Sequence, residues 1–138
     1  IVLAEAGINR LAYNDLNKYV LKEIVPAVNQ GILSVQYRKG NLELESYFSK
    51  LRCPNTESAF IAERICIEEL EADCNSAVGV LASGNKLHLR VLSENGARLI
   101  EDMGEFTIGS EVQISRQLAQ KLLDQGAKDL IYKYPKLL

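Results

Sequence analysis

The strongest constraint on the fold is a strict alternation of polar and apolar side chains over residues Lys86–Leu92. The apolar residues at every second position are Leu87, Leu89 and Val91. Successive side chains of a strand point to opposite faces of a sheet, so one face should be buried and the other exposed. This pattern is typical of an antiparallel sheet that helices cover on one side only.

Two more strands are predicted beside this one. Residues 77–82 form an apolar run that a short loop containing Gly84 joins to it. On the other side, Asn95 and Gly96 are the pair that a two-residue type I′ turn prefers, because both central positions of that turn need positive φ. A third strand over about 97–106 should therefore pair back on the second. The sequence predicts a three-stranded antiparallel meander.

Two helices are predicted to flank the meander. The first begins at Asn55 or Thr56 and continues to about Leu70, with small and apolar residues at helical spacing. The second follows Ser110, which has capping-box spacing to Gln113. Together these elements predict an α+β domain, in which helices cover one face of a three-stranded antiparallel sheet.

The first 52 residues follow a different pattern. Residues 1–4 and 32–35 are apolar runs of the kind found in strands buried on both faces, which belong to parallel or mixed sheets with several members. Short helices are expected between these runs, and Asn41 should cap a helix that stops before Pro54. This part is expected to be a fragment of an α/β region whose sheet has further strands outside the first 52 residues.

Charge and cysteine usage exclude several classes of protein. The chain has 16 Lys and Arg against 18 Asp and Glu, a net charge of −2 that gives no electrostatic footprint for nucleic acid. No apolar run approaches the roughly 20 residues of a membrane-spanning helix. The three cysteines lack the even, dense pattern of small secreted domains, so reduced thiols and a cytoplasmic location are expected.

Periodicity and spacing alone point to no active site. His88 lies on the polar face of its strand and is expected to be solvated. Cys66 is expected in the core, and Cys53 is given no role. The spacing of the cysteines and His88 lacks the paired short loops of a zinc site, so no metal is expected. Cys74 differs from the other cysteines because it falls in a loop just past a predicted helix end.

Four short motifs, in order along the chain, resemble the porphobilinogen deaminase family, whose members are also called hydroxymethylbilane synthases. The family pattern AGxxRL is matched by AGINRL at residues 6–11, and LPAVGQG by VPAVNQG at residues 25–31. AER occurs at residues 62–64, and LEGGC is matched by LEADC at residues 70–74. The resemblance extends over essentially the whole chain.

The resemblance implies a three-domain enzyme of which this chain is the C-terminal portion. Residues 1–30 would be the tail of the second domain, residues 31–52 would return to the first domain, and residues 53–138 would form the C-terminal cofactor-carrying domain. The family's catalytic aspartate lies in the N-terminal portion, so no catalytic residue is expected in this chain. The chain alone is expected to be inactive, and the complete enzyme is expected to be a monomer.

The resemblance also implies a cofactor and a reaction. Cys74 would hold a dipyrromethane through a thioether, and Arg10 and Gln30 would contact this cofactor. The family condenses four molecules of porphobilinogen onto that primer with loss of ammonia and releases hydroxymethylbilane. Acetate and propionate groups on the pyrroles need Arg or Lys partners.

The chain departs from the family pattern beside the anchor, and this leaves alternatives open. Ala72 and Asp73 replace the two glycines before the cysteine. Asn29 replaces a glycine in the VPAVNQG segment at residues 25–31, which is expected to be a hinge and is here called the hinge motif. A second hypothesis is a non-catalytic α+β module for binding or assembly that has lost the cofactor. A third is a thiol-dependent redox or transfer protein, which the acidic neighbours of Cys74 disfavour because they oppose thiolate formation.

Overall fold

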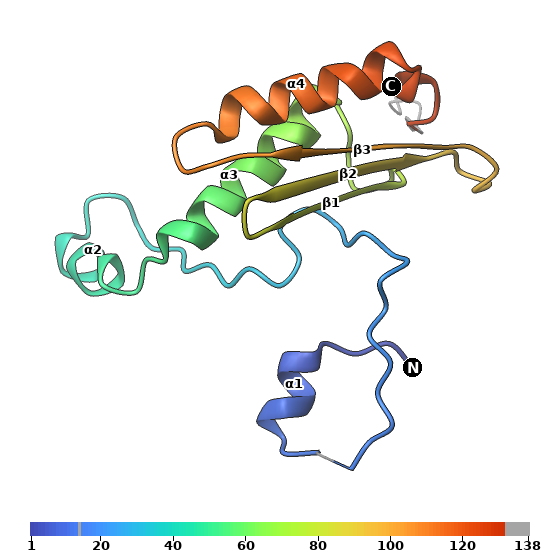
Figure 1. Ribbon diagram of the computed structural model, residues 1–138. Helices are drawn as coiled ribbons and strands as arrows, with labels where there is room; N and C mark the ends of the chain where they lie inside the picture. The colour runs from blue at the N-terminus through green and yellow to red at the C-terminus, as the bar shows by residue number, and fades with distance from the viewer. Residues whose placement is uncertain (14, 132–138) are drawn as a thin grey trace, which may run out of the picture.

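The computed structural model describes residues 1–13 and 15–131 and confirms the α+β class (Figure 1). Residues 132–138 of the predicted C-terminal domain lie outside the described residues. In chain order the elements are α1 (Glu5–Arg10), α2 (Leu42–Ser49), α3 (Pro54–Glu69), β1 (Val78–Ser83), β2 (Lys86–Leu92), β3 (Leu99–Glu105), α4 (Glu111–Asp124) and the short 3-10 helix η1 (Ala127–Asp129).

The three strands form one antiparallel sheet in the order β1-β2-β3. Leu89 of β2 is paired with Val80 of β1 and with Asp102 of β3. Figure 1 shows α3 and α4 together on one side of this sheet, while the segment before α2 passes on the opposite side. The predicted meander with helices on one face is therefore confirmed.

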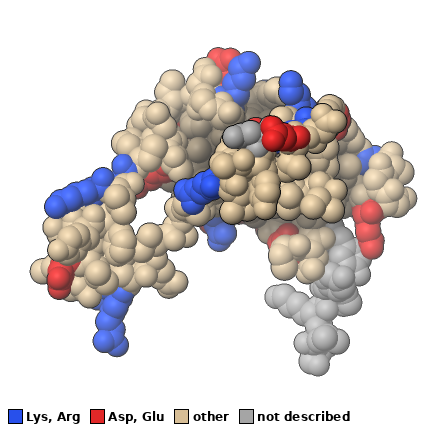
Figure 2. Space-filling view, turned by 90° about the horizontal axis from the view of Figure 1, so that it is seen from below, with Lys and Arg blue, Asp and Glu red and all other residues tan. Residues whose placement is uncertain are grey.

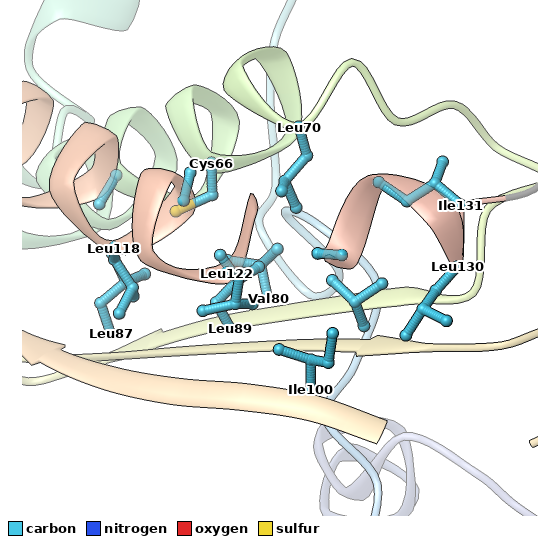
Figure 3. Packing of buried hydrophobic residues seen from close by; sticks show 14 of the residues in the cluster. Cys66, Leu70, Val80, Leu87, Leu89, Ile100, Leu118, Leu122, Leu130 and Ile131 are labelled. Atoms are coloured by element: carbon cyan, nitrogen blue, oxygen red, sulfur yellow. The ribbon is translucent and has the colours of Figure 1, made fainter. Parts of the chain in front are cut away.

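The core fills the space between the sheet and the two helices (Figure 3). Leu87, Leu89 and Val91, which the alternation pointed inward, are completely buried. Small residues line the contact between α3 and α4, where the Ser115 hydroxyl donates to the Ala62 carbonyl at 2.9 Å. This bond satisfies a buried hydroxyl and lets the helices approach closely.

One predicted helix start is wrong, and at a second helix the start is correct but the predicted capping box is absent. α3 begins at Pro54 with Cys53 as its N-cap residue, instead of being capped by Asn55 or Thr56. Proline suits the first helical position because it has no N–H group to satisfy and its φ is already helical. At α4 the capping box is not formed, because the Ser110 hydroxyl donates to the Thr107 carbonyl at 3.0 Å and accepts from the Thr107 N–H at 2.9 Å.

The loop between β2 and β3 is longer than the predicted two-residue turn. Pairing ends at Leu92 and Leu99, and within the loop Gly96 has a positive φ of 69° while Asn95 does not. The Asn95 side chain instead accepts hydrogen bonds from the Ser93 hydroxyl at 2.8 Å and the Ala97 N–H at 3.1 Å. These side-chain contacts compete with the tight turn and stabilise the wider loop.

The two strands predicted in the N-terminal part are not formed. Residues 1–4 and 32–35 have no regular structure and are largely exposed. A strand buried on both faces needs neighbouring strands and covering helices, and the described residues supply none there. The helices at α1 and α2 do form, and the Asn41 side chain caps α2 by accepting from the Leu44 N–H at 3.1 Å, as predicted. Beyond α1, the helices expected before residue 25 are absent from the described part of that segment.

Replacing Leu89 by alanine should lower the free energy of unfolding by about 2–5 kcal/mol, because it leaves a cavity in the centre of the sheet. The matched control is Leu33→Ala, which changes an exposed side chain and should alter stability by less than about 0.5 kcal/mol. Urea unfolding followed by circular dichroism measures both. Equal losses for the two variants would contradict this description of the core.

Candidate functional site

The loop that carries Cys74 begins at a well-defined helix end. The Ala72 N–H donates to the Ile67 carbonyl at 3.2 Å and the Glu71 N–H donates to the Glu68 carbonyl at 3.1 Å, which are the two bonds of a Schellman motif. The left-handed residue of the motif is Glu71, with a φ of 53°, whereas Ala72 and Asp73 have ordinary negative φ. The structure therefore accommodates both replacements of glycine without backbone strain.

Asp73 organises the loop around the thiol. Its Oδ1 accepts from the Asn75 N–H at 2.9 Å and from the Ser76 hydroxyl at 3.0 Å, and its own N–H donates to the Ser76 hydroxyl oxygen at 3.1 Å. These bonds, chiefly the one from Asn75, hold the pKa of Asp73 below its ordinary value. Cys74 lies between these residues and is exposed, so its sulfur is accessible.

The acidic neighbours of Cys74 are paired with cations. The pairs are Arg64 with Glu68 at 2.8 Å, Arg116 with Glu69 at 2.8 Å and Lys128 with Glu71 at 3.5 Å. Each pair is exposed and contributes at most about 1 kcal/mol to stability. Their more important consequence is electrostatic, because the surroundings of Cys74 are less negative than the sequence alone suggests.

A buried carboxylate joins the hinge motif to α3 and β1. Glu63 of α3 is only 4% exposed. Its Oε2 accepts from the Asn29 N–H at 2.6 Å and its Oε1 accepts from the Ala82 N–H of β1 at 2.7 Å. Burial raises the pKa of Glu63, and the two N–H groups partly offset this effect. Sequence reasoning gave Glu63 no role, although a charged residue next to the apolar stripe of a helix was an available signal.

Gln30 is held in a tight turn of the hinge motif. Asn29 and Gly31 on either side of it have positive φ values of 57° and 87°. The Gln30 side chain folds back, and its Oε1 accepts from the Ala27 N–H at 3.2 Å. Gln30 and Glu63 both line a pocket of about 680 Å³, which the hinge, the first half of α3 and the turn between β1 and β2 enclose. This volume is in the range of small-molecule pockets.

The structure does not bring the three predicted cofactor residues together. Gln30 lies beside the N-terminal half of α3, whereas Cys74 follows the C-terminal end of that helix. Arg10 is exposed at the end of α1, in a part of the chain that stands apart from the sheet in Figure 1. Among the described residues, no hydrogen bond or ion pair connects any two of them.

The prediction that His88 is solvated holds only in part, because the side chain lies on the open face of the sheet but is paired there with a carboxylate. Its side chain is 19% exposed, and its Nε2 lies 2.9 Å from Oε2 of Glu101. The same carboxylate pairs with Arg90 at 2.7 Å. Hydrogen bonds from Arg90 and then from His88 lower the pKa of Glu101. Cross-strand pairing brings these groups together, since Glu101 stands opposite Arg90 in the register.

The other two cysteines have contrasting environments. Cys66 is fully buried between α3 and α4, as predicted, and burial raises the pKa of its thiol to about 12. Cys53 is exposed at the start of α3, and the nearby hydroxyl and N–H groups of Thr56 lower the pKa of its thiol. This second feature was missed because it depends on Cys53 being the N-cap residue.

Metal-binding clusters and membrane-spanning helices are both absent from the described residues. Within residues 1–13 and 15–131 no three His, Cys, Asp or Glu side chains are grouped in a way that could hold a metal ion. None of the described helices is long and apolar enough to cross a bilayer. On the face shown in Figure 2, Lys and Arg side chains are scattered rather than gathered into one patch.

The amide protons of Asn29 and Ala82 should shift together during an acid titration, because both donate to the Glu63 carboxylate. Their common midpoint should lie above 4.5, the ordinary pKa of a glutamate. Since folding raises this pKa, the stability contributed by Glu63 is greatest at low pH and is lost as the pH rises through the folded-state pKa. Proton–nitrogen correlation spectra measure the shifts.

Glu63→Gln is the control for this titration, because it keeps the shape of the side chain and removes the titrating group. Both amide shifts should then become independent of pH in this range. Separate midpoints for the two amides would contradict the bridging role of Glu63. A common midpoint at or below 4.5 would contradict the claim that burial outweighs the two hydrogen bonds.

Comparison with known proteins gives consistent results. Residues 1–46 match the family model described as porphobilinogen deaminase, dipyromethane cofactor binding domain. The porphobilinogen deaminases of Helicobacter hepaticus and Geobacillus kaustophilus are 32% and 34% identical to the chain, and each match covers 99% of the chain and 46% of the relative. That of Rubrobacter xylanophilus is 35% identical over 95% of the chain and 44% of the relative.

The chain thus spans a little less than half the length of these curated relatives, an extent consistent with a C-terminal portion. The matched family model ends before the Cys74 loop, whereas the matches to the relatives extend over nearly the whole chain. The four motifs, the α+β fold and these matches agree, and the chain is similar over nearly its whole length to the matching portion of porphobilinogen deaminases.

Proposed function

We propose that this chain is the C-terminal portion of a hydroxymethylbilane synthase. In this proposal Cys74 carries a dipyrromethane primer through a thioether. Together with the N-terminal portion of the same enzyme, the chain then supports the condensation of four porphobilinogen molecules with loss of ammonia to give hydroxymethylbilane. The observation that carries the proposal is Cys74 itself, an exposed thiol held in an ordered loop at the position of the family's anchor motif.

The residues present suit such a cofactor. The Cys74 sulfur is accessible for attachment, and the Asp73 turn fixes the backbone on either side of it. When bound, the dipyrromethane supplies the pyrrole carbon that is extended. The exposed Arg10 guanidinium is a partner for pyrrole carboxylates, and the amide of Gln30 is a further hydrogen-bonding group.

Exposed apolar residues support the need for an N-terminal portion. Large apolar side chains are exposed along the first 51 residues; they include Ile1, Val2, Leu11, Tyr19, Ile24, Leu33, Leu42 and Leu51. A surface of this kind is typical of a region that packs against another protein segment. We assign residues 1–30 to the second domain, residues 31–52 to the first and residues 53–138 to the C-terminal domain. The complete enzyme is proposed to be cytoplasmic and monomeric.

A non-catalytic module for binding or assembly is the second candidate function. It is favoured by the self-contained core around β2, which requires nothing from the first 52 residues. Ala72 and Asp73 do not favour it, because their backbone conformations are unstrained. The two candidates differ in whether Cys74 is modified.

Intact-mass analysis of the native protein that contains this sequence should show the added mass of one dipyrromethane. Peptide mapping should place the addition on Cys74, and Cys74→Ser should remove it. Cys53→Ser is the matched control, because it removes the other exposed thiol and should leave the modification unchanged.

A folded but unmodified protein would favour the non-catalytic module instead. Modification at Cys53 would contradict the assignment of the anchor. The 138-residue chain alone should form no product from porphobilinogen, since the proposal places the catalytic aspartate in the N-terminal portion.

A further inference from the structure

Residues 23–31, here called the strap, lie against the C-terminal domain although the sequence assigns nearly all of them to the second domain. In Figure 1 the chain before α2 passes beneath β1, on the side of the sheet away from α3 and α4. Contacts hold the strap at both ends and in its middle, and each contact involves a different part of the C-terminal domain.

The middle of the strap meets the edge of the sheet. The Val80 N–H of β1 donates to the Pro26 carbonyl at 2.9 Å, which satisfies an outward-facing donor of an edge strand. Next to it, Gly79 leaves room for the strap. A Cβ atom at Gly79 would lie 2.5 Å from the Val25 carbonyl oxygen and 2.9 Å from the Val25 Cβ. Glycine is therefore needed at this position because the two backbones approach closely.

Arg90 fastens the first end of the strap. Its guanidinium donates to the Glu23 carbonyl at 2.6 Å through Nη1. The opposite side of the guanidinium is fixed by the Glu101 carboxylate, which Nε meets at 2.8 Å and which His88 also contacts. Glu101 and His88, on the open face of the sheet, thus orient the Arg90 guanidinium that binds the strap.

Glu63 fastens the second end. Its carboxylate accepts the Asn29 N–H while its other oxygen is bonded to β1. Asn29 precedes Gln30 directly, so the turn that presents Gln30 is tied to α3 and β1 together. Charge-assisted hydrogen bonds of this kind, shielded from water, are stronger than neutral ones.

We infer that the strap is mechanically part of the C-terminal domain, and that Arg90, Gly79 and Glu63 are the residues that hold it there. Any movement between domains then pivots before residue 23 and after residue 31, not within the hinge motif. One consequence rests on the proposed function: Gln30 and the Cys74 anchor move as one body, which keeps the spacing between these two cofactor residues fixed while the domains shift.

Hydrogen exchange of the 138-residue chain, read by mass spectrometry and at single amides by NMR, tests the strap. In the chain without substitutions the Val80 and Asn29 amides should be protected from exchange, although Val80 lies on an edge strand. Gly79→Ala should accelerate exchange in residues 23–31 by roughly tenfold or more, because the strap is displaced. Exchange in β2 and α4 should not change. Ser83→Ala, a small residue on the same face of β1, is the matched control and should leave the strap unchanged.

Arg90→Gln provides a second variant, in case Gly79→Ala does not fold. It should accelerate exchange mainly at the Glu23 end of the strap and less at Asn29. The inference would be overturned if the Val80 and Asn29 amides exchanged rapidly in the chain without substitutions. It would also be overturned if exchange in the strap were unchanged in both variants. These exchange measurements do not depend on the cofactor. The inference about the strap can therefore be contradicted while Cys74 is found modified, and it can be supported while Cys74 is found unmodified.

Discussion

The buried carboxylate of Glu63 is the interaction on which the arrangement of the segments depends. It lies in α3, yet its two oxygens bind one N–H of β1 and one N–H of the hinge motif. A carboxylate that is 4% exposed is costly to bury unless its oxygens are satisfied, and here two backbone donors satisfy them. Three segments far apart in the sequence are therefore tied at one point.

Helices cover only one face of the sheet, and this determines where the apolar core and the polar contacts lie. The inner face of β2 is filled by leucine and valine against α3 and α4, which leaves the outer face for polar chemistry. On that face Glu101 gathers His88 and Arg90, and Arg90 reaches the backbone of the strap. At the far end of α3, a Schellman motif and the Asp73 turn present Cys74 to solvent.

Local sequence patterns correctly predicted the features that depend on residues close together in the chain. The alternation at Lys86–Leu92 correctly predicted the strand, which of its faces is buried, and the buried leucines. Asn41 was correctly predicted to cap α2. The expected strands at residues 1–4 and 32–35 failed because strands buried on both faces depend on partners elsewhere. The environments of His88 and Glu63 were missed for a related reason, since their partners come from another strand and from a segment 34 residues away. Of the candidate site, the family resemblance proposed Cys74 as the anchor, whereas only the structure showed how the Cys74 loop and the hinge motif are held.

The central claim is that the ordered loop at Cys74 carries a pyrrole cofactor, and Ehrlich's reagent tests this most directly because it colours pyrroles. The native protein should give the coloured product on the proteolytic peptide that contains Cys74, and the Cys74→Ser protein should give none. A correctly folded native protein that stays colourless, or colour that survives Cys74→Ser, would contradict the account.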